Sequence, residues 1–84
     1  MYTVQYHPLV VRQDIPKLDA MIRRRIKGAI EQKLVTAPET FGVPLRRSLR
    51  GYRKLRVGDY RVVFDMEEDR CVILAVGHRK DIYR

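Results

Sequence analysis

Three cationic side chains carry the strongest chemical signal in this sequence. Gly58-Asp59 is typical of a two-residue hairpin turn between runs rich in β-branched and aromatic residues. Pairing across that turn sets Arg56 opposite Arg61. Because side chains alternate along a strand, Lys54, Arg56 and Arg61 then share one face. Like charges directly across a hairpin destabilise a sheet, so cations kept on an open face indicate a site for something anionic.

The opposite face of the same hairpin is apolar. The residues that alternate onto it are Leu55, Val57, Tyr60, Val62 and Phe64. Side chains of this kind favour strands that pack on a core. The hairpin is therefore expected to have a hydrophobic core face and a cationic open face.

The last strand, about residues 70–79, is expected to pair with residues 60–66 after a three-residue turn at 67–69. This register places Val72, Leu74 and Val76 on the core face. It places on the open face Cys71, Ile73, Ala75, Gly77 and Arg79. Ala75 would then lie opposite Arg61 and leave room for the guanidinium. A shift by one residue would exchange the two faces.

The N-terminal half is expected to supply helices behind the core face. Residues 2–6 alternate as a first strand, and Pro8 fits the first turn of a short helix that runs to about Asp14. Asp19 is a suitable N-cap for a second helix. Its apolar stripe recurs every four residues and consists of Ile22, Ile26, Ile30 and Leu34.

The remaining segments complete a small α+β arrangement. Residues 36–50 are predicted to form a loop with at most one helical turn, followed by strands at about 51–57, 60–66 and 70–79. The order β-α-α-β-β-β implies a small antiparallel sheet packed against two N-terminal helices. The 84 residues are expected to form a single domain, 1–84.

The charge balance points to an anionic partner. The sequence has 18 lysines and arginines against 10 acidic residues, a formal net charge of +8. This excess favours binding to nucleic acid, to an acidic protein, or to both, while an ordinary basic surface stays the alternative. A solvated helix face is the preferred interpretation of Arg23-Arg24-Arg25, with phosphate contact or partner binding left open.

The remaining composition predicts a cytoplasmic protein without a metal or other cofactor. The single Cys71 cannot form an internal disulfide and lies in an apolar strand, which indicates an inert thiol in a reducing compartment. The N-terminus has no signal-peptide pattern, and apolar runs are too short for a membrane span. Two histidines, one cysteine and no clustered carboxylates argue against a metal site.

Four segments resemble the RelE/ParE superfamily of bacterial and archaeal toxins, and the RelE branch in particular. They are His7-Pro8, Leu49-Arg50-Gly51, the run from Leu55 to Phe64, and the ending Val76-Gly77-His78-Arg79-Lys80-Asp81-Ile82-Tyr83. They follow the expected order and span nearly the whole chain. The hairpin and the Gly-His-Arg ending are specific only when taken together.

The resemblance implies the toxin of a type II toxin–antitoxin system. RelE-like toxins are endoribonucleases that cut mRNA in the A site of the ribosome, and their fold is similar to that of microbial ribonucleases. A cognate antitoxin is implied as partner, covering the basic face or the helix at 19–35, with a higher-order complex also possible. ParE-like relatives share the fold but act on DNA gyrase, and this remains the alternative function.

The resemblance also implies a set of site residues. Lys54, with its neighbour Arg56, matches the family's basic residues on the first hairpin strand. Arg61 matches an arginine on the next strand, and Arg79 matches an arginine at the end of the last strand. Tyr83 matches a tyrosine near the C-terminus. Tyr52 stands where some RelE members have a lysine, and His78 replaces a lysine of others.

These residue types suit metal-independent RNA cleavage by attack of a 2′-hydroxyl. Arg61 and Arg79, assisted by Arg56, would stabilise the phosphate charge, since a guanidinium stays charged and binds bidentately. Lys54 among cations is the candidate base. Tyr83 would stack on a base or donate a proton, with C-terminal packing as its alternative. His78 is either a proton donor or a hydrogen-bonded structural histidine.

Overall fold

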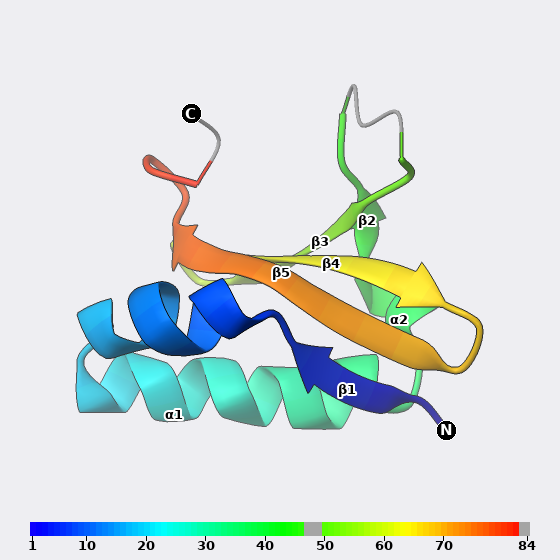
Figure 1. Ribbon diagram of the computed structural model, residues 1–84, viewed down its shortest axis with the longest axis horizontal. Helices are drawn as coiled ribbons and strands as arrows, with labels where there is room; N and C mark the ends of the chain where they lie inside the picture. The colour runs from blue at the N-terminus through cyan, green and yellow to red at the C-terminus, as the bar shows by residue number, and fades with distance from the viewer. Residues whose placement is uncertain (47–49, 83–84) are drawn as a thin grey trace.

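The sheet has five strands, in the order β1-β5-β4-β3-β2, within the residues that the computed structural model describes, 1–46 and 50–82 (Figure 1). The strands are β1 (Thr3–Tyr6), β2 (Val43–Pro44), β3 (Arg53–Val57), β4 (Tyr60–Glu67) and β5 (Arg70–His78). Strands β2 to β5 pair antiparallel, and β1 pairs parallel with β5. The predicted α+β class is confirmed, with two additions: the parallel edge strand and the two-residue β2.

The helices lie together on one side of the sheet (Figure 1). Their bounds are η1 (Val10–Asp14), η2 (Ile15–Lys17), α1 (Ala20–Ala29), η3 (Ile30–Leu34) and α2 (Pro38–Phe41). The predicted N-cap is confirmed, since the Asp19 carboxylate accepts the Ile22 N–H at 2.9 Å. At the other end α1 runs directly into the wider turn η3, so one continuous helical segment backs the sheet.

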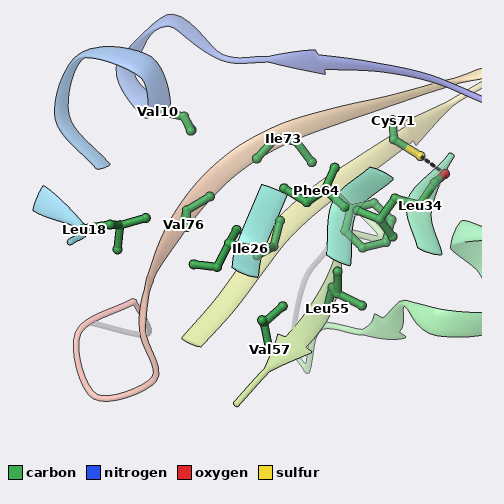
Figure 2. Packing of buried hydrophobic residues seen from close by; sticks show 12 residues of the cluster. Val10, Leu18, Ile26, Leu34, Leu55, Val57, Phe64, Cys71, Ile73 and Val76 are labelled. Carbon is green, nitrogen blue, oxygen red and sulfur yellow. Dashed lines mark hydrogen bonds between the residues drawn. The ribbon is translucent and has the colours of Figure 1, made fainter. Parts of the chain in front are cut away.

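A single apolar core fills the space between this helical segment and the sheet (Figure 2). Ile26, Ile30 and Leu34 of the predicted stripe are buried, and Ile22 packs beside them half-exposed. On the sheet side Val62 and Phe64 are fully buried. The other residues of the cluster are Val10, Leu18, Leu55, Val57, Cys71, Ile73 and Val76.

The register of the β3–β4 hairpin is the predicted one. Lys54 pairs with Val63, Arg56 with Arg61, and Val57 with Tyr60. At the turn Gly58 has a φ of 60°, in the left-handed region that favours glycine over residues with a Cβ. The turn chemistry and the strict alternation of apolar and polar residues therefore set the two faces of this hairpin.

The predicted register of the last strand is wrong, and two local features explain why. The β4–β5 turn has two residues, not three, so that Arg70 pairs with Glu67. A bulge follows further along, because Phe64 pairs with Ile73 while Val63 pairs with Ala75, which leaves Leu74 as the extra residue. The bulge shifts the alternation by one position within β5.

The bulge reassigns half of the last strand to the other face. Cys71 and Ile73, predicted for the open face, are fully buried in the core, while Val72 and Leu74, predicted for the core, are only half-buried. Beyond the bulge Val76 returns to its predicted core position. The residue opposite Arg61 is Gly77 and not Ala75.

A carboxylate hydrogen-bonds to the edge of β5 beyond the point where β1 ends. The pairing of β1 with β5 reaches Ile73, and the His7 N–H then donates to the Ile73 carbonyl at 2.9 Å. Beyond that point the Val76 N–H donates to Asp14 Oδ2 at 2.8 Å. A side chain of η1 therefore replaces the strand partner that β1 no longer provides.

Candidate nucleic-acid interface

Lys54, Arg56 and Arg61 share one face of the β3–β4 hairpin, opposite the helices, and we call these three residues the cationic face. The register requires it, because residues paired across an antiparallel ladder point to the same side. Their exposure differs, however. Arg56 is exposed, Lys54 is half-buried, and Arg61 is only 5% exposed.

The expectation of an open position for Arg61 is therefore wrong. Its Nη1 donates to the carbonyl oxygens of Gly58 and Tyr60, both at 2.8 Å. The facing residue, Gly77, has no side chain to fill this space, and Ile82 lies 3.8 Å from where a Cβ on Gly77 would be. The guanidinium is thus folded against its own hairpin turn through Nη1, and its Nε and Nη2 carry further N–H donors.

Arg79 reaches the same turn from the end of β5. Its backbone N–H donates to the Asp59 carbonyl at 2.8 Å, and its Nε lies 3.8 Å from Asp59 Oδ1. Both side chains of this ion pair are largely exposed, so the pair adds little stability. An incoming anion can therefore compete for Arg79. Arg61 and Arg79, predicted together from distant segments, meet at one turn.

His78 lies on the helix side of the strand, as its parity with Val76 implies. Its ring contacts the ring of Tyr60 edge-on, with 5.4 Å between the centroids. Its Nδ1 accepts the Lys80 backbone N–H at 3.1 Å, which places the proton of the neutral ring on Nε2. These contacts give His78 a structural role, and the residue also lines a pocket of about 540 Å³ together with Asp14, Lys17 and Asp81.

Two predicted features lie outside the described residues. Tyr83 is one, and Leu49 of the resemblance segment is the other. Within the described residues no group of three or more His, Cys, Asp and Glu side chains is placed to hold a metal ion. No helix in that same part of the chain is long and apolar enough to cross a membrane.

Sequence reasoning missed the contact between α1 and the hairpin turn. A Cβ on Gly58 would lie 3.2 Å from both Nη1 and Nη2 of Arg25. The bare Cα therefore allows this guanidinium to lie against the turn. The run Arg23-Arg24-Arg25 signals charge in the sequence, but helical periodicity alone does not indicate which arginine meets the hairpin.

The fold is that of a known class of small toxins. The family model described as "ParE toxin of type II toxin-antitoxin system, parDE" matches residues 4–83. Toxin RelG of Mycobacterium tuberculosis is 39% identical over 85 residues, which cover 99% of this chain and 97% of that protein. Toxin RelE of the same organism is 31% identical over 74 residues, or 86% and 76% of the two chains.

Solved structures agree with the sequence relatives. The toxin–antitoxin complex RelBE2 of Mycobacterium tuberculosis contains a chain with a TM-score of 0.84 at 34% identity, covering 95% of this chain and 93% of that one. The RelB–RelE complex of Methanococcus jannaschii gives a TM-score of 0.73 at 27% identity, with 94% of both chains covered. The protein belongs to the RelE/ParE superfamily of toxins from type II toxin–antitoxin systems.

Proposed function

We propose that this toxin is a ribosome-dependent endoribonuclease that cleaves mRNA in the A site, and that residues 1–84 form its single domain. The observation that supports this most directly is the convergence of Arg61 and Arg79 on the Gly58-Asp59 turn. Two guanidiniums, one from β4 and one from the residue after β5, suit the stabilisation of extra negative charge on a phosphate under attack. The relatives named RelG and RelE lie in the branch where this activity is expected.

The structure suggests a division of roles within this site. Two carbonyl acceptors hold the Arg61 side chain in place. Its remaining N–H donors can therefore bind a phosphate without a large further loss of side-chain entropy. Exposed Arg79 and Arg56 would close on the substrate from the rim. Lys54 remains our candidate base and Tyr83 our candidate for stacking or proton donation. His78, which lies on the helix side of β5, stays a candidate proton donor, with its contacts to Lys80 and Tyr60 as the structural alternative.

The partners follow from the same proposal. Two structural neighbours are complexes of a toxin with a RelB antitoxin. We propose that a cognate antitoxin neutralises this chain in the cytoplasm, and that ribosome and mRNA are its targets. Val63 and Ile73 offer no apolar surface to an antitoxin, because Ile73 lies in the core and Val63 is only 7% exposed.

A matched pair of variants tests the nuclease. Arg79→Ala removes an exposed arginine that pairs with a hairpin carboxylate at one end of β5. Arg70→Ala removes an equivalent one at the other end, where Nη2 lies 3.6 Å from Glu67. Primer extension on translated mRNA should show cleavage reduced about 10²–10³-fold by Arg79→Ala and unchanged by Arg70→Ala. Equal cleavage by both variants would reject the proposed site.

The second candidate is a ParE-like inhibitor of DNA gyrase, and the observation that favours it is the name of the matching family model. A gyrase supercoiling assay with the purified toxin separates the two. Inhibition of supercoiling without cleavage of ribosome-bound mRNA would transfer the assignment to the ParE-like function.

A further inference from the structure

A second cationic site lies between α1 and the hairpin, beside the turn where Arg61 and Arg79 meet. A groove of about 340 Å³ runs between α1 and the hairpin, with Arg24 and Arg25 on the helix and Arg56 and Gly58 on the hairpin. Lys33 also lines it, and its ammonium lies 5.5 Å from the centre of the Phe41 ring. No lining residue of this groove carries a carboxylate.

The arginines of this groove have no carboxylate partner within residues 1–46 and 50–82. Among the described residues, no carboxylate lies within 4.0 Å of the guanidinium nitrogens of Arg24, Arg25 or Arg56. Arg25 is nevertheless positioned, since its guanidinium lies against the bare Cα of Gly58. Three like charges kept together without a counter-ion repel one another, and an external anion would relieve that repulsion.

The cationic lining of this groove favours nucleic acid over a protein as the ligand. The opposite flank of α1 carries a different groove of about 250 Å³, whose lining is largely apolar and includes Tyr6, Val11, Ile26 and Ile30. A protein helix or strand gains most by burying apolar side chains, so that second groove suits a protein. The arginine groove offers planar forks that match phosphate oxygens.

Arg56 connects this groove to the cationic face. It lines the groove, and it also belongs to the cationic face through its pairing with Arg61. We propose that the substrate strand itself continues from the cationic face around β3, and that Arg24 and Arg25 bind its phosphates beyond the cleaved bond. This inference rests on the proposed RNA substrate, and it adds a backbone-binding subsite outside the cleavage site.

Binding to a labelled single-stranded RNA oligonucleotide, without ribosomes, tests the subsite. Fluorescence anisotropy over a salt series gives the slope of log affinity against log salt, whose magnitude falls by about 0.7 for each phosphate that the protein no longer neutralises. Arg24→Gln/Arg25→Gln should lower the slope by about 1.4. The control Arg12→Gln/Arg70→Gln removes the same charge elsewhere on the exposed surface and should leave the slope nearly unchanged.

The possible outcomes are distinct. A thermal melt checks that each variant is folded. If the double variant is unstable, Arg24→Gln alone, which leaves Arg25 against Gly58, should lower the slope by half as much. Equal slopes for the groove variant and the control would overturn the subsite, as would loss of antitoxin affinity with RNA binding intact. If the groove variant loses RNA binding while wild type cleaves nothing on ribosomes, the subsite stands and the nuclease proposal fails.

Discussion

The two faces of the β3–β4 hairpin alternate residue by residue, yet they are stabilised by different means. On one face Leu55 and Val57 are buried in the apolar core beneath α1. On the other face Arg61 is equally buried, but carbonyl oxygens of its own turn hold it. The first face gains from burial shared with the helices. The second depends on a few local hydrogen bonds, so it can carry charge while the core maintains the fold.

A deletion of core volume on the apolar face should have the largest effect on the free energy of unfolding. Leu55 is 2% exposed, so Leu55→Ala removes a buried side chain and leaves a cavity. We expect the free energy of unfolding to fall by about 2–5 kcal/mol, measured by urea denaturation. Cleavage per folded molecule should stay unchanged. A loss below about 0.5 kcal/mol would show that the apolar face does not anchor the hairpin.

Arg61→Ala should have a smaller effect on stability but a large one on cleavage. The carbonyl oxygens of Gly58 and Tyr60 lose their buried donor, which costs about 1–3 kcal/mol. Exposed Arg56, directly opposite, is the control. Arg56→Ala should leave stability unchanged or raise it slightly, because repulsion across the hairpin is removed. Equal melting temperatures for Arg61→Ala and wild type would contradict the anchoring role.

The smallest expected effect is a pH dependence on the core side. Burial raises the pKa of the Cys71 thiol above its ordinary value of 9.0, with a further contribution from Glu39. The unfolded chain therefore loses this proton first. The stability that Cys71 contributes is complete below about pH 9 and is lost as pH rises through the folded pKa.

Cys71→Ala supplies the control for this pH dependence. It should lower stability by a constant amount but flatten the decline between about pH 8 and 10, as followed by urea denaturation. Tyrosine ionisation has its midpoint higher, near about pH 10, and its contribution is common to both proteins. Identical slopes for wild type and Cys71→Ala would show that the thiol is not the group responsible.

The contrast between faces also explains what could be predicted from the sequence. The Gly58-Asp59 turn and the alternation of cationic and apolar residues predicted the β3–β4 register pair by pair. Residues 71–76 of β5 contain no charged or polar residue apart from the thiol, so nothing in them marks which side faces the core. The sequence therefore gives no signal for the bulge at Leu74, and Cys71 and Ile73 were assigned to the wrong face.

The sequence indicated which residues gather at the site, but not how deeply each of them is buried. Sequence alternation placed Lys54, Arg56 and Arg61 together, and the resemblance added Arg79. Burial of Arg61 depends on the absence of a side chain at Gly77, whose position across the ladder depends on the unpredicted bulge. Strand β2 escaped prediction for a simpler reason, since two residues ending in Pro44 give no periodic signal.

The parallel pairing of β1 with β5 has a consequence for synthesis. Thr3 pairs with Arg70, and the Asp14 carboxylate meets Val76, so contacts made by the first residues need the last strand. Such long-range contacts form slowly because the whole intervening chain must be ordered. While the chain is being translated, η1 has no strand edge to bind and Arg79 has not yet reached the hairpin turn. The nascent polypeptide is therefore unable to assemble its cationic site until residues 70–79 have also emerged from the ribosome.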